Sequence, residues 1–144
     1  MEISNIKISL MTAIGLAGSF IATLFGGWDT ELRTLILFMA VDYITGLMVA
    51  GVFKNSTKTK TGALQSKAGW KGLCKKGMTL FIVLVAYRLE LMVGSEFIRN
   101  AVIIAYIVNE TISIIENAGL MGIKIPQALQ KGIDILVQKT EGGE

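Results

Sequence analysis

Polar and ionisable side chains interrupt an otherwise apolar stretch near the C-terminal end of the chain. The stretch is "YIVNETISIIENAG", Tyr106 to Gly119, and it contains two glutamates. A helix turns by about 100° per residue, which places its polar side chains within one arc of about 120°. The arc comprises Tyr106, Asn109, Glu110, Ser113, Glu116 and Asn117, and Arg99 lies on the same arc nearer the start of the segment. A stripe of this kind favours contacts with other helices or with water over contact with lipid.

Three further ionisable side chains lie in predicted apolar segments: Asp42, Arg88 and Glu90. A charge inside a membrane costs about 2.5–3.5 kcal/mol on insertion scales, so such residues normally face a bundle interior or a watery cavity. By depth, Arg88 is predicted to pair with Asp42 or Glu110. One arginine cannot neutralise four carboxylates, so the others must be protonated, pair between subunits, or face water. A closed bundle held by buried polar contacts is the alternative to a stripe that meets other copies or water.

The composition indicates an integral membrane protein. The chain has 144 residues, of which 52% are hydrophobic and only 17% are charged, and its mean hydropathy is +0.59. A soluble surface needs more charge than that. Histidine is missing and Cys74 is the only cysteine, so we expect no metal site, cofactor or disulfide, and we interpret Cys74 as a small apolar residue at an interface. The sequence contains no nucleophile paired with a base and no phosphate-binding loop, so nothing in it indicates an enzyme.

Four apolar segments approach the roughly 20 residues that a helix needs to cross a bilayer. They cover residues 8–27, 32–53, 77–94 and 97–122. Only a helix satisfies its own backbone hydrogen bonds in lipid. The predicted fold is therefore a single all-α membrane domain with about four transmembrane helices.

The segment 54–76 is predicted to be a cytoplasmic loop, because it concentrates lysines and basic loops stay inside. Four spans then place both termini inside as well. Within the loop, Lys67, Lys71 and Lys75 repeat every four residues, which places them on one face of a helix with Trp70 elsewhere on it. Together with Lys76 this helix is predicted to lie on the membrane surface, or else to be a solvated loop that only sets topology. Nucleic-acid binding is not expected at a net charge of +3.

A last, amphipathic helix is predicted over residues 125–139, because Pro126 suits a first helical turn and apolar residues follow at helical spacing. We expect it on the cytoplasmic side, against the membrane or a second copy. The final residues, "TEGGE", are expected to be disordered.

Small residues recur at intervals that let helices approach closely in lipid. Gly18, Ala22 and Gly26 do so in the first span, and Gly46 and Ala50 in the second. They predict helix packing and, less specifically, self-association.

Three stretches, in order, resemble one family: "LILFMAVDYITGLMVAG", "SKAGWKGLCKK" and "AVIIAYIVNETISIIENAGLMGIKIPQAL". The family is the bacteriophage holins grouped with the clostridial toxin-secretion holins, and the resemblance covers about residues 32–136. Its most specific part is the asparagine–glutamate pair of "YIVNETISIIENAG", followed by "G.KIP".

The resemblance implies a phage- or prophage-encoded protein that oligomerises in the bacterial cytoplasmic membrane. The resemblance also implies that such a protein opens a timed lesion there, through which an endolysin or a large toxin passes. Intramembrane Asp, Glu and Arg also occur in proton relays, so a small proton- or ion-coupled transporter or channel is the alternative. A structural membrane anchor that recruits partners through the lysine loop is a third possibility.

Overall fold

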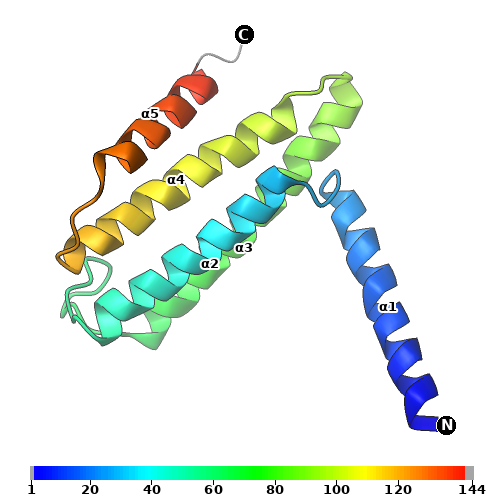
Figure 1. The fold of residues 1–144 in the computed structure, drawn as a ribbon, viewed down its shortest axis with the longest axis horizontal. Coiled ribbons are helices and arrows are strands. Elements are labelled where there is room, and N and C mark those ends of the chain that lie inside the picture. The colour runs from blue at the N-terminus through cyan, green and yellow to red at the C-terminus, as the bar shows by residue number, and fades with distance from the viewer. Residues whose placement is uncertain (1, 142–144) are drawn as a thin grey trace.

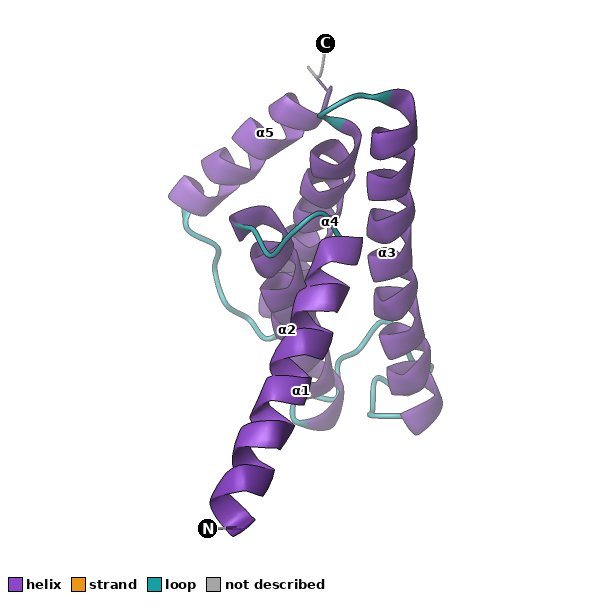
Figure 2. Ribbon diagram, turned by 90° about the vertical axis from the view of Figure 1, so that its right-hand side faces the viewer, coloured by secondary structure: helices purple, strands orange, loops and turns teal. Residues whose placement is uncertain are grey.

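The computed structural model describes residues 2–141, and it is built of helices (Figure 1). In chain order these are α1 (Glu2–Leu24), α2 (Thr30–Gly51), α3 (Ser66–Val93), α4 (Ile98–Leu120) and α5 (Gln127–Glu141). The part of the chain that is described contains no strand (Figure 2). The all-α prediction is therefore confirmed.

Helices α2, α3 and α4 form the central bundle, and α2 packs most extensively against α4 (Figure 1). Its core is made by Leu32, Leu35 and Met39 from α2, Val83 from α3, and Ile103 and Ile107 from α4. The three α2 residues follow the spacing of one helix face, as do the two from α4. Apolar periodicity thus selects the sides on which the three helices meet.

Capping residues fix the helix ends that join at one end of this bundle. The carboxylate of Asp29 accepts a hydrogen bond from the Leu32 N–H at 3.0 Å, which satisfies a free donor at the start of α2. At the end of α3, Gly94 takes a left-handed conformation with φ 71° and donates its N–H to the Glu90 carbonyl. Each cap terminates its helix where the chain must reverse.

Three of the described helices are long and apolar enough to cross a membrane: α1, α2 and α4. Helix α3 is not among them, because every stretch of 18 residues within it carries at least three charged side chains. Its apolar part spans about 25 Å at 1.5 Å per residue, less than the roughly 30 Å hydrocarbon core. Four spans and the inside placement of both termini therefore stay predictions.

The second half of the predicted loop 54–76 is helical, as the four-residue spacing of its lysines predicted, but it is not a helix separate from the third segment. Helix α3 begins at Ser66, so residues 66–76 are its first turns and the third segment, 77–94, is only its continuation. The basic residues Lys67, Lys71 and Lys75 are exposed on these turns. This part of α3 stands beside α2: the Tyr43 hydroxyl of α2 donates a 3.4 Å hydrogen bond to the Gly69 carbonyl.

Helix α1 projects away from the bundle (Figure 1), and none of its residues is buried. It also begins earlier than predicted, at Glu2. Gly18 has open space around it, and with Ala22 it lines a groove of about 600 Å³ between α1 and the start of α2. Among the described helices, none therefore lies along the predicted packing stripe of α1.

Helix α5 folds back along α4 (Figure 1). Ile133 is buried, and Leu136 packs against the bundle core. The amphipathic helix is thus confirmed, but its apolar face meets its own chain, where the sequence led us to expect a membrane surface or a second copy. Two residues of the expected disordered tail, 140 and 141, belong to α5, and residues 142–144 lie outside the described part.

Gly26 belongs to the turn after α1 and not to the helix, and it is the glycine that the turn most clearly requires. Its φ is +82°, and a Cβ there would lie 2.8 Å from the Tyr87 ring and 2.9 Å from Arg99 Nε. Gly26→Ala is expected to lower the free energy of unfolding by about 2 kcal/mol or more, from the left-handed backbone and the clash.

Thermal unfolding in detergent, followed by circular dichroism, measures this loss. Gly18→Ala is the matched control, because nothing lies within 4 Å of the added methyl group. Equal melting temperatures for the two variants would contradict the assignment of Gly26 to this crowded turn.

Candidate functional site: a polar centre inside the helix bundle

Lys76 lies between two carboxylates in the interior of the bundle. Its Nζ is 2.8 Å from Asp42 Oδ2 of α2 and 2.5 Å from Glu110 Oε2 of α4. All three side chains are largely buried, with 14%, 7% and 12% of their surface exposed. One ammonium from α3 therefore joins the other two helices of the bundle.

Asp42 is the most connected member of this centre. Its Oδ1 accepts hydrogen bonds from Ser113 Oγ at 2.5 Å and from Asn117 Nδ2 at 3.0 Å, both on α4. Asn117 Nδ2 also donates to Thr45 Oγ1 at 2.9 Å. Both carboxylate oxygens are therefore satisfied, as a buried ionised group requires.

The polar stripe predicted on α4 divides into two parts. Glu110, Ser113 and Asn117 point into the bundle and make the contacts above, and Tyr106 is half-buried against the apolar core. Asn109 and Glu116 are exposed. The stripe thus serves the interior of its own bundle along one edge and faces outward along the other.

The predicted pairing of Arg88 with Asp42 or Glu110 is wrong, because Lys76 holds that position. Arg88 is exposed, and among the described residues no ion pair involves it. Lys76 was placed in a surface loop because the apolar run begins after it. Helical spacing could have indicated its inward position, because Leu80 and Val83, four and seven residues later, lie on the same face of α3 as Lys76. Val83 on this face is fully buried.

A second polar cluster lies at the other end of the bundle, around the buried guanidinium of Arg99. Its Nη1 is 2.6 Å from Asp29 Oδ2, Nη2 donates to the Gly27 carbonyl at 3.3 Å, and Nε donates to the Phe25 carbonyl. The backbone N–H of Arg99 donates to Glu90 Oε2 at 2.8 Å. Arg99 and Glu90 are therefore separate from the Lys76 centre, and Arg99 ties α4 to the turn between α1 and α2.

The remaining predicted packing residues lie near the Lys76 centre. A Cβ on Gly46 would be 3.8 Å from Asn117 Nδ2 and 4.0 Å from Lys58 Nζ, so this glycine gives both groups room beside α2. Ala50 is buried, and Trp70 is 67% exposed. No group of histidine, cysteine and carboxylate side chains suited to a metal ion occurs among the residues described.

The pKa of Asp29 lies below its usual value of 3.8. Burial disfavours the charged carboxylate, but the hydrogen bond and charge of Arg99 and the Leu32 N–H outweigh it. A depressed pKa stabilises the fold above pH 3.8, and this contribution is lost as the pH falls through the lower, folded value.

Lys76→Met is expected to destabilise the bundle strongly. It leaves two buried carboxylates without their cation, a change that costs about 3–5 kcal/mol for a buried pair. The melting temperature of the purified protein in detergent checks this, with Arg88→Met as the control of matched charge and length. If Arg88→Met lowers the melting temperature as much as Lys76→Met, then the assignment of Lys76 to the bundle interior is wrong.

Asp29→Asn is expected to melt at a lower temperature than the parent protein at pH 7. The difference should shrink below pH 3.8, where the parent also loses the charge. Melting curves recorded across this pH range test the sign, and a difference that stays constant into acid would refute the role of the ionised carboxylate.

Comparison with known proteins places the chain in a family. Residues 19–138 match the model of the bacteriophage holin family. An uncharacterized protein of Listeria monocytogenes is 38% identical over 85% of this chain and 83% of its own length. An uncharacterized 14.9 kDa protein of Clostridium perfringens is 35% identical over 85% and 88%. A probable holin of Bacillus phage phi105 is 29% identical over 76% of this chain and 79% of its own length.

No solved structure matches. The chain belongs to the bacteriophage holin family.

Proposed function

We propose that this holin-family protein oligomerises in a bacterial cytoplasmic membrane and opens a lesion there. An endolysin, or a large toxin, then crosses the lesion to reach the cell wall. The observation that carries the proposal is the divided polar side of α4, whose inner edge is satisfied within one chain and whose outer edge is not buried. Membership of the holin family and the likeness to a probable phage holin support it.

The closed bundle represents the waiting state in this proposal. Lys76, Asp42 and Glu110 satisfy one another there, so the centre does not need water. Asn109 and Glu116 are exposed on a helix that has the composition of a membrane span. Polar groups are costly against lipid, so these two favour contact with another copy or with water.

Opening would exchange contacts within one chain for contacts between chains. When enough copies gather, Glu110 leaves Lys76, Ser113 and Asn117 leave Asp42, and these side chains turn toward a water-filled lumen while apolar faces turn toward lipid. Helix α1 supports assembly, because Gly18 and Ala22 line an open groove on it at which a helix of another copy could approach closely. Such a transition depends on concentration and needs no catalysis.

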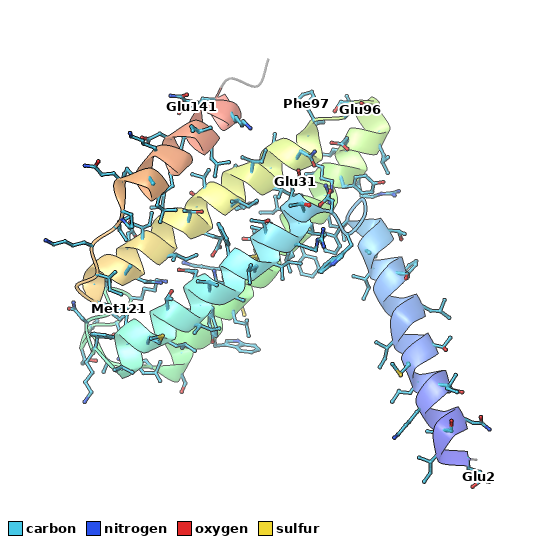
Figure 3. The ribbon with its side chains drawn as sticks, viewed as in Figure 1. Glu2, Glu31, Glu96, Phe97, Met121 and Glu141 are labelled. Carbon is cyan, nitrogen blue, oxygen red and sulfur yellow. The ribbon has the colours of Figure 1, made fainter. Side chains whose placement is uncertain are left out.

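The charges at the two ends of the bundle favour one orientation. The Asn55 side chain donates a 3.2 Å hydrogen bond to the Leu120 carbonyl, which brings the loop after α2 to the end of α4. Figure 3 places Met121 at the end opposite Glu31 and Glu96. Lysines of the loop, of the first turns of α3 and of the segment after α4 gather at the Met121 end, so we assign this end to the cytoplasm.

Glu110→Gln is expected to advance the lesion. It removes one of the two carboxylates that hold Lys76 and so weakens the closed bundle. The full chain is induced in bacteria beside a cytoplasmic cell-wall hydrolase, and membrane potential and hydrolase release are followed together. The parent should show a delay and then a sudden collapse of the potential with release, and the variant a delay shortened about twofold or more.

Glu141→Gln, an exposed change on α5, is the control and should keep the parent's delay. A transporter predicts saturable flux without release of a folded protein, and an anchor predicts neither. Collapse without hydrolase release would contradict the proposed lesion, and an unchanged delay for Glu110→Gln would contradict the role of the Lys76 centre in timing.

A further inference from the structure

We propose that a lysine-lined pocket between α2, the loop 52–65 and the first turns of α3 binds the phosphate of an anionic phospholipid headgroup. The pocket has a volume of about 530 Å³. This falls within the range of about 300–1,000 Å³ that is typical of small-ligand sites. The inference rests on the membrane placement of α2 and α4 proposed above, but not on lesion formation.

The charge of the pocket is the first argument. Lys58, Lys67, Lys71 and Lys75 line it, and Lys76 lies at its base between Asp42 and Glu110. Among the described residues the ion pairs are those of Lys76 and Arg99, so the other four ammonium groups have no carboxylate bound. The two carboxylates offset Lys76 and one further lysine, and the pocket keeps an excess of positive charge.

The shape of the backbone is the second argument. Lys67, Lys71 and Lys75 share one side of α3 and line the pocket as exposed residues, whereas Gly69 and Gly72 of the same turns pack against Tyr43 of α2. Lys58 approaches from the loop on the other side, where Gly46 leaves room for its Nζ. The ammonium groups therefore come from two directions, which suits a tetrahedral phosphate with several acceptor oxygens.

The position along the bundle identifies the source of the phosphate. Tyr43 and Gly69 bring the first turns of α3 against the second half of α2, so the pocket extends toward the end at which α2 would leave the membrane. Leu47, Ala50 and Leu64 add apolar walls beside the lysines. Basic pockets between helices at the cytoplasmic surface are suited to anionic lipid headgroups. A phospholipid can contact the lysines with its phosphate and the apolar walls with its acyl chains, whereas free phosphate can contact only the lysines.

The test uses two double variants with equal loss of charge. Lys58→Gln with Lys71→Gln alters the pocket, and Lys60→Gln with Lys124→Gln alters exposed lysines at the same end outside it. Each full chain is purified in detergent, and binding of phosphatidylglycerol is titrated by native mass spectrometry. Phosphatidylcholine and inorganic phosphate are titrated in parallel, and circular dichroism verifies folding.

We expect the parent to retain phosphatidylglycerol in preference to phosphatidylcholine. The pocket variant should bind it about tenfold or more weakly, and the control variant within about twofold of the parent. Equal losses in the two variants would reduce the site to general surface charge and overturn the proposal. Binding of inorganic phosphate with the same affinity as the lipid would overturn the lipid assignment.

Lesion timing is measured separately, so the two proposals can fail independently. A pocket variant that loses the lipid and still opens a lesion leaves the lipid site standing. If the pocket variant is found to be misfolded, the single Lys71→Gln against Lys60→Gln comparison decides, with the same ordering expected.

Discussion

One ammonium group shared by two carboxylates determines how this bundle is built. Lys76 reaches Asp42 and Glu110 from a third helix, so the carboxylates of α2 and α4 gain their shared cation only if α3 is in place. Apolar packing alone would allow the three helices to slide or rotate, since Leu, Ile and Val contacts are not directional. The buried ion pairs require one register, and Ser113 and Asn117 restrict the rotation of α4 further by donating to Asp42. The interaction specifies a particular arrangement more than it adds stability.

Helices α5 and α1 contact the central bundle to different extents. Helix α5 adds an apolar face to α4 through Ile133 and Leu136, which covers part of the bundle without using its polar groups. Helix α1 is held at its end, through the turn that Arg99 binds, and its remaining length does not contribute to the core. This division suits the function proposed above, in which α1 would meet other copies while the Lys76 centre keeps the monomer closed.

Much of this arrangement could be predicted from residue patterns, and the failures have identifiable causes. Helices α2 and α4 and the amphipathic character of α5 follow from hydropathy and periodicity, and the alignment of Glu110, Ser113 and Asn117 on one side of α4 follows from the helical wheel. The partner of Asp42 did not follow, because counting depth from the ends of apolar runs assumes that every charge outside a run is in water. Helix α3 begins at Ser66, before the apolar run starts, and the long aliphatic side chain of Lys76 places its ammonium group in the interior. The division of the stripe depends on where α3 lies, which no property of α4 reveals.

The turn between α1 and α2 has a mechanical consequence. Gly26 and Gly27, with φ of 82° and 107°, form the joint that sets the direction of α1, in backbone conformations that glycine adopts readily. The carbonyls of Phe25 and Gly27 on this joint are held by Arg99, which is in the first turn of α4. Because Arg99 links this turn to α4, a change in the tilt of α1 would act on the helix that carries Glu110, Ser113 and Asn117. A movement of α1 would thus be transmitted through Arg99 to α4, the helix whose rotation would open the Lys76 centre.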